Sequence, residues 1–313
     1  LLPILDTLRV TSASNGNPTL VPYFTNQLSI GYQKYDPVTM SSFNVQASVN
    51  NTLRNITSKQ WKITDGKGSQ LTQPMNMDGF WSNWSSDLRL TLSITLPDDR
   101  FSFTSTTNGR FNHQEGMTST ATTLEEAVAA ANKQQFDDSY TDPNELRSIT
   151  NSINAGEDLS FEYRDDYLTA SLNGSLSYRH SENNLSNNAT TTYGGGNSNS
   201  GIRDTYDFSY GTNIIAFIPW RNMRLGTDLN MNSRRGYAGK NANTDELIWN
   251  LSASFSFLKG NKASLQLALY DILHQRSNMS YNISATRATQ SQNTNITSYF
   301  MATLTYRLSS FGD

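Results

Sequence analysis

Four acidic residues gather in one stretch of the sequence and could bind a cation: Asp137, Asp138, Asp142 and Glu145. Carboxylate oxygens are the ligands that Ca²⁺ prefers in proteins. The spacing of these four residues does not match an EF-hand loop. We therefore interpret them as solvated acids of a loop and predict no metal site.

The remaining residue types do not form a recognisable catalytic set. His113, His180 and His274 are far apart in the sequence, and there are no cysteines to ligate a metal or to form disulfides. The sequence contains no H-E-x-x-H, no G-x-S-x-G and no glycine-rich phosphate loop. We predict that the protein is not an enzyme, that it has no catalytic residues and that it uses no cofactor.

Two tryptophans, Trp81 and Trp84, are candidates for a binding site. An indole ring can stack on a sugar, but barrel proteins also use tryptophan and tyrosine as anchors at the membrane interface. Trp61 and Trp249 could also take either role. Both interpretations stay open, with Trp81 and Trp84 as possible loop aromatics that contact a ligand.

Composition limits the partners and the elements that could position these residues. The chain of 313 residues has a net charge of -3, and only 16% of its residues are charged, which argues against a nucleic-acid partner. The longest apolar run, at 214–220, is far shorter than the roughly 18 residues that a membrane helix needs. Membrane strands escape this test because half of their residues are polar.

Most of the chain alternates between apolar and polar residues with a period of two, which predicts β-strands with one apolar face. The clearest example is 88–96, where Leu88, Leu90 and Leu92 alternate with Arg89 and Thr91. The C-terminal stretch 299–308 repeats the pattern. We count about eleven strands, joined alternately by short turns and long loops, as in outer-membrane barrels. The short turns are expected at 36–40, 97–100, 164–166, 219–222 and 258–262. The predicted fold is an all-β, antiparallel, up-and-down transmembrane β-barrel.

The apolar rows lack charges along their central parts, which favours a surface that faces lipid. Burying one such side chain is worth roughly 1.5–3 kcal/mol, whereas a charge at the membrane midplane costs about 2–4 kcal/mol. Charged residues with the opposite parity are expected to face the lumen. These residues are Arg89, Arg110, Asp158, Asp207, Arg224 and Asp228. A soluble, secreted β-sandwich that binds glycan is the alternative fold.

Two regions break the alternation. Residues 1–20 are expected to be a loop. Residues 114–146 are expected to be a long loop that contains a short helix at 124–135, which begins at a capping box formed by Thr123 and Glu126. The helix could cover the barrel mouth as a lid or be a passive insertion. We treat 1–313 as a single barrel region.

Four motifs resemble the outer-membrane β-barrel family of Bacteroidota, which is related to the TonB-dependent receptors. They are G-N-P-T-L-V-P at 16–22, T-Q-P-M-N at 72–76 with Gly79, L-Y-D-I-L at 269–273 and L-T-Y-R-L at 304–308. They occur in the family's order across nearly the whole chain.

The resemblance implies that the chain is the C-terminal half of a barrel of about 22 strands. The first strands, a signal peptide, a plug domain and a TonB box would then lie upstream, since 1–6 (L-L-P-I-L-D) do not form a signal peptide. The implied location is the cell outer membrane, and the implied function is nutrient uptake. The implied partners are outer-membrane lipid, the barrel-insertion machinery and a TonB system acting through the plug, whereas the ligand stays unknown. A barrel that serves adhesion or assembly without transport is the alternative function.

Overall fold

The computed structural model describes residues 5–9, 12–64, 66, 68–96, 98–137, 140–185, 202–237, 243–258, 260–277, 279–283, 288–292 and 296–307. Nearly all regular structure is β. The strands of the long sheet are β3 (Phe24–Asp36), β4 (Ser41–Leu53), β7 (Asn83–Thr95), β8 (Phe101–Ala121), β9 (Leu146–Arg164), β10 (Leu168–Asn183), β11 (Ile202–Ile218), β12 (Met223–Arg235), β13 (Asp245–Phe257), β14 (Ala263–Tyr270) and β17 (Tyr299–Tyr306).

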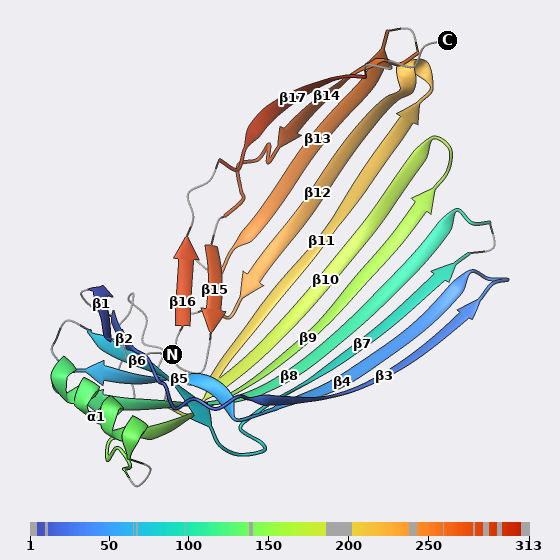
Figure 1. The fold of residues 1–313 in the computed structure, drawn as a ribbon. Coiled ribbons are helices and arrows are strands. Elements are labelled where there is room, and N and C mark those ends of the chain that lie inside the picture. The colour runs from blue at the N-terminus through green and yellow to red at the C-terminus, as the bar shows by residue number, and fades with distance from the viewer. Residues whose placement is uncertain are drawn as a thin grey trace, which may run out of the picture.

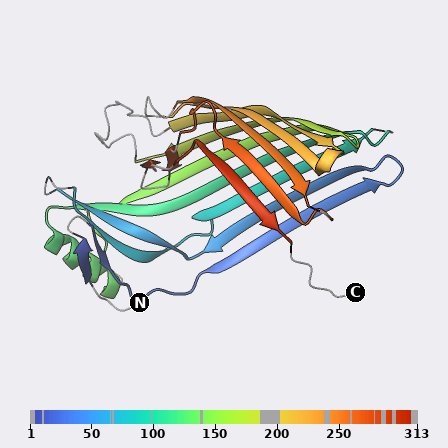
Figure 2. The same cartoon turned by 90° about the horizontal axis from the view of Figure 1, so that it is seen from above.

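The long strands follow one another as an antiparallel meander from β3 to β17 within a 15-stranded sheet. Tight turns reverse the chain at one end of these strands, where Met40, Asp99 and Asn222 have positive φ angles of 49°, 55° and 47°. Figures 1 and 2 show the sheet curving into an open trough, with β3 in blue and β17 in red at its edges. The prediction of an antiparallel, mostly β structure is therefore confirmed.

The strand register sorts the side chains onto two faces, because directly opposed residues of an antiparallel pair share a face. Leu90 is opposite Val45 on one side, whereas Arg89 is opposite Gln46 on the other. We call the first side the apolar face and the second side the polar face. Leu28, Leu172 and Leu304 on the apolar face are 64%, 62% and 68% exposed. The expected absence of charges from this face has exceptions within the strands, because Glu157 is opposite Leu176 and Lys34 is opposite Phe43, both on the apolar face.

In the described residues, the long sheet does not close on itself. β3 pairs only with β4, and β17 pairs only with β14. Both edge strands are exposed along nearly their whole length on both faces. Within the described part of the chain, no second sheet packs on the apolar face as in a β-sandwich.

A small module sits at one end of the trough (Figure 1). It consists of β1 (Leu5–Arg9), β2 (Ser12–Asn15), β5 (Asn55–Ile63), β6 (Gln70–Met77) and α1 (Leu124–Phe136), and we call it the end module. One expectation is corrected here, because residues 1–20 are not all loop but include β1 and β2. Arg54 has a φ of 53°, which ends β4 and turns β5 away from the long sheet.

The expected loop at 114–146 is shorter than predicted. β8 continues to Ala121, because its end pairs with β9 on one side and runs parallel to β5 on the other. The helix α1 ends one residue later than expected, and its N-cap Thr123 accepts a hydrogen bond from the backbone N–H of Glu126. α1 packs Ala127 and Ala131 against Trp61 and Leu71 in a small core.

Two short elements complete the structure. A hairpin of β15 (Met279–Ile283) and β16 (Ala288–Gln292) forms a separate two-stranded sheet, and the 3₁₀ turn η1 spans Trp220–Asn222. Among the described residues, no helix has the length and apolar character needed to cross a membrane.

Candidate functional site

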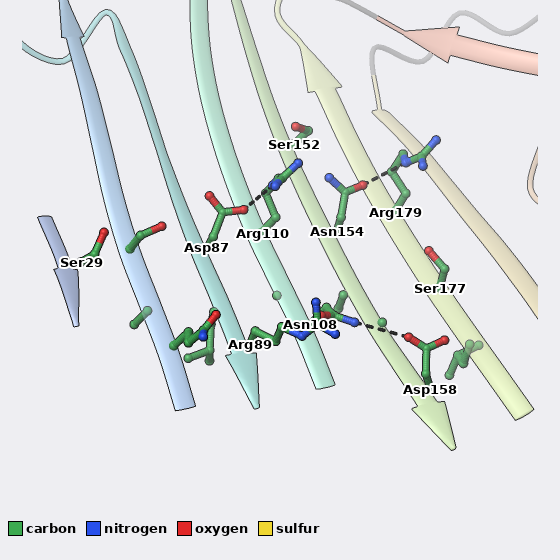
Figure 3. Close-up of a pocket in the computed structure, with 18 of the residues that line it drawn as sticks. Ser29, Asp87, Arg89, Asn108, Arg110, Ser152, Asn154, Asp158, Ser177 and Arg179 are labelled. Carbon is green, nitrogen blue, oxygen red and sulfur yellow. Dashed lines mark hydrogen bonds and ion pairs between the residues drawn. The ribbon is translucent and has the colours of Figure 1, made fainter. Parts of the chain in front are cut away.

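The polar face of β3 to β10 forms a pocket of about 1170 Å³ on the concave side of the trough. Serine, asparagine and glutamine side chains supply much of its wall, and charged residues come from β7, β8, β9 and β10 (Figure 3). Such a wall can hydrogen-bond a polar solute from several sides. Of the six charged residues expected to face a lumen, the pocket brings together Arg89, Arg110 and Asp158.

The charged side chains of the pocket differ in how far they are neutralised. Arg110 forms an ion pair with Asp87 on the neighbouring strand. Arg179 Nε donates a 2.9 Å hydrogen bond to Asn154 Oδ1, so its contact is an amide and not an acid. Asp158 accepts a longer bond of 3.4 Å from Asn108. Figure 3 shows these three contacts side by side across the sheet.

Arg89 differs from these residues, because it has no hydrogen-bond or ion-pair partner within the described part of the chain. Its side chain is exposed on the polar face of β7, where it lies opposite Asn108 of β8. A guanidinium group without an acidic partner can form paired hydrogen bonds with a carboxylate or a phosphate. Arg89 is therefore the residue best placed to bind an anionic group in this pocket.

The other three predicted residues lie on the polar face of β11 and β12, outside the pocket lining. Asp207 accepts bonds of 2.9 and 2.7 Å from the hydroxyl of Tyr237. Asp228 accepts bonds from Asn230 and Asn250, and the guanidinium of Arg224 lies 5.4 Å from the ring of Phe217. They belong to the same wall but have local partners.

Two pocket residues were missed by the sequence analysis. Asp87 and Arg179 have the same polar parity as the predicted residues on their strands, and both line the pocket. The alternation of β7 and β10 would have found them, because the parity rule applies to every charged residue in a strand.

The two candidate tryptophans lie at the end of β7. Trp84 is within the strand and not in a loop; it is opposite His113 on the apolar face, and its ring lies 4.7 Å from that of Phe111. Trp81 precedes the strand, is 67% exposed and meets Trp84 edge to face at 6.3 Å. These rings are outside the pocket lining and form an aromatic row beside the apolar surface, as an interface anchor would.

Two of the four acids in the sequence cluster, Asp142 and Glu145, are not solvated loop acids, whereas Asp137 is exposed. Asp142 and Glu145 both form ion pairs with Lys59, which is 1% exposed. Trp61 donates a 3.0 Å bond from Nε1 to Asp142 and is itself buried, so it is not an interface anchor. The ammonium group of Lys59 occupies the place that a cation would take. In the described residues no cluster of His, Asp or Glu could hold a metal, while Asp138 lies outside them.

Burial, hydrogen bonds and the charge of Lys59 together determine the pKa of Asp142. Burial alone would raise the pKa of this carboxyl group, but hydrogen bonds and the nearby ammonium group outweigh that effect and lower the pKa below its ordinary value. The backbone N–H of Asn144 supplies one of these bonds, at 3.1 Å. Asp142 therefore stays ionised inside the end module.

Two of the motifs that carried the family resemblance bind to each other. Asn17 donates a 3.0 Å bond to the carbonyl of Pro74, and Gln73 donates one of 3.4 Å to the carbonyl of Gly16. Asn76 bonds both backbone polar groups of Val21, at 2.9 Å each. The motifs are therefore two halves of one junction between the end module and the start of β3.

The helix α1 holds this same junction. Gln135 donates bonds of 3.2 Å to Gly16 O and to Asn17 Oδ1, and Asn132 accepts a bond of 3.1 Å from Asn15. The helix packs on β5, β6 and the end of β8. It is thus a structural part of the end module.

An antiparallel sheet with an exposed apolar face and a polar concave face has the two-faced strands that are typical of outer-membrane β-barrel proteins. The comparison of sequences agrees, because the Outer membrane protein beta-barrel family matches residues 1–183, more than half of the chain. The chain belongs to this family, and its location is the outer membrane.

Other comparisons add little. No curated protein matches the chain. Among solved structures, CdiB from Acinetobacter baumannii is similar over 82% of this chain and 40% of its own length, at 12% identity and a TM-score of 0.28. The chain thus spans less than half the length of that protein, and so low a TM-score carries no argument.

Proposed function

We propose that this chain is the C-terminal part of a TonB-dependent receptor-like barrel of a Bacteroidota outer membrane, and that it takes up a polar nutrient. In this proposal the polar face is the wall of the lumen, and the apolar face contacts lipid. Energy comes from a TonB system that acts on a plug encoded upstream, and the barrel-insertion machinery places the protein in the membrane.

One observation carries the proposal. The concave polar face gathers charges of both signs around one pocket, where, among the described residues, Arg89 and Arg179 lack acidic partners and Asp158 lacks a cationic partner. Unneutralised groups on a wall bind solute more strongly than exposed ion pairs, which are already satisfied. The expected solute is polar and carries an anionic group. Recognition of this solute needs only binding, so we propose no covalent step, no cofactor and no catalytic residue for this chain.

The contact between the motifs at 16–22 and 72–76 supports the kinship with the receptor family. These residues are far apart in the sequence, yet their side chains and backbones bond each other in the structure. Because the two motifs bond each other, they resemble the receptor family as one structural unit. Such a resemblance is more specific than two separate sequence matches.

The test uses the full-length gene in its own cells, with uptake of radiolabelled candidate nutrients as the measurement. We expect Arg89→Glu and Arg179→Glu to reduce uptake of an anionic nutrient by about tenfold or more, as the loss of a charged hydrogen bond of 1.5–3 kcal/mol implies. Arg224→Glu, the same change outside the pocket, is the matched control. Deleting TonB should abolish uptake. If neither the pocket variants nor the TonB deletion alters the uptake of any nutrient, the transport proposal is wrong, and a barrel for adhesion or assembly takes its place.

A further inference from the structure

The carboxyl group of Glu157 lies in the middle of the apolar face. Glu157 is opposite Leu176 on β10 and Thr107 on β8. Along the strands it lies between two aromatic levels, with Phe101 beside Tyr163 at one end and Trp84 beside Phe111 at the other. On the apolar face of β7 to β10, no other charged side chain lies between these levels. This position is at membrane depth, where a carboxylate exposed to lipid is unfavourable.

Two hydroxyl groups hold the carboxyl group of Glu157 in place. Ser105 Oγ donates to Oε1 at 2.5 Å, and Thr107 Oγ1 donates to Oε2 at 2.6 Å. Such short bonds are typical of hydroxyl groups bonded to an ionised carboxylate. Each oxygen keeps a second lone pair that can accept a further bond. Neither neighbouring hydroxyl brings a positive charge, so the site has a negative charge that is not compensated.

The surface around Glu157 is recessed. Its neighbours on the apolar face include Gly109, Ala155 and Gly174, and a methyl group added at Gly174 would meet no atom within 4 Å. Leu176 and Leu172 stand beside this recess and are 50% and 62% exposed. A side chain from a neighbouring molecule can therefore reach the carboxylate of Glu157 while the backbone of that molecule contacts Leu172 and Leu176.

We propose that the apolar face of β8–β10 around Glu157 binds a second transmembrane β-barrel protein, through a lysine or arginine on the outer face of the partner. Charge complementarity selects this occupant. Acyl chains offer no donor to the carboxylate, and a twofold contact with a second copy would bring Glu157 against its own equivalent. A cationic side chain from a different barrel satisfies the free lone pairs and neutralises the charge.

The first experiment separates lipid contact from protein contact. Full-length wild type, Glu157→Leu and Glu157→Gln are compared with Thr212→Leu, a polar-to-apolar change on the same face of β11. In vesicles of pure lipid, Glu157→Leu should unfold at a higher urea concentration than wild type. In native outer membranes, a photoreactive residue at Leu176 should crosslink wild type to another barrel, and both Glu157 variants should lose at least nine-tenths of that product. Thr212→Leu should keep it.

The second experiment identifies the contact by charge exchange. The crosslinked peptide of the partner should be a membrane strand with a lysine or arginine, and changing that residue to glutamate should remove the crosslink. Glu157→Lys together with that change should restore it. Three outcomes would each overturn the proposal. They are crosslinks to lipid alone, a crosslink only to a second copy of this chain, and a protein crosslink that survives Glu157→Leu.

Discussion

The side-chain amide of Asn76 bonds both backbone polar groups of Val21. Its Oδ1 accepts from Val21 N–H, and its Nδ2 donates to Val21 O, each at 2.9 Å, while the same Nδ2 also bonds Arg54 O at 2.8 Å. One amide therefore joins the segment before β3, the turn between β4 and β5, and β6. The amide thus bonds both backbone groups of Val21, as a residue of a neighbouring antiparallel strand would.

We expect Asn76→Ala to lower the free energy of unfolding by about 1–3 kcal/mol, because three exposed hydrogen bonds of modest net value are lost together. Asn76→Asp should be at least as destabilising as alanine, since a carboxylate oxygen would replace the donor that faces the carbonyl oxygens of Val21 and Arg54. Urea unfolding of the full-length protein in lipid vesicles measures the change. Asn44→Ala on the polar face of β4 is the control. Equal stability of Asn76→Ala and wild type would show that the junction is not stabilising.

Removal of the buried cation should destabilise the end module strongly. Lys59→Met leaves Asp142, which is 5% exposed, and Glu145 without their ion-pair partner. Breaking a buried pair in this way costs about 3–5 kcal/mol. Hydrogen exchange of β5, β6 and α1 measures the local effect, and Lys62→Met on the exposed side of the same strand is the control. Adding Asp142→Asn to Lys59→Met should recover part of the loss.

The end module should lose stability in acid. Because the pKa of Asp142 is lower in the folded protein than its ordinary value of 3.8, the contribution of this carboxylate is complete above that value. This contribution to stability is lost as the pH falls below 3.8 and then through the pKa that Asp142 has in the folded protein. Hydrogen exchange of β5 and α1 from pH 6 downward, corrected for the intrinsic exchange rate, should show this loss in wild type. Asp142→Asn should flatten the dependence, and Asp98→Asn in a distant turn should not. A parallel decline in all three proteins would contradict the assignment.

Two glycines on neighbouring strands should respond differently to the same change. A methyl group at Gly211 would lie 2.6 Å from the backbone carbonyl oxygen of Leu229, whereas at Gly174 it would meet no atom within 4 Å. Overpacking against backbone costs roughly 1–3 kcal/mol. Gly211→Ala should therefore reduce the fraction of heat-modifiable, folded barrel on a gel, and Gly174→Ala should leave it unchanged. Equal folded fractions would mean that β11 and β12 can separate to admit the methyl group.

The strand character and the two faces could be predicted from the sequence, because side chains in a strand alternate with a period of two. The alternation of Leu88, Leu90 and Leu92 with Arg89 is enough to separate the faces of β7. The same rule could have found Asp87 and Arg179, which the sequence analysis passed over. It also carries Glu157 onto the apolar face, although the apolar rows were expected to lack charges.

The sequence by itself thus determined the strands and the polarity of their two faces, since both follow from local periodicity, and its motifs supplied the resemblance to an outer-membrane family. Only the tertiary structure decided which residues meet across strands. The loop acids Asp142 and Glu145 proved to be partners of Lys59, because the left-handed turn at Arg54 carries β5 out of the long sheet and beneath α1. The hydroxyl groups that hold Glu157 likewise depend on the register of β8 and β9. Contacts of this kind depend on long-range pairing, which local periodicity does not specify.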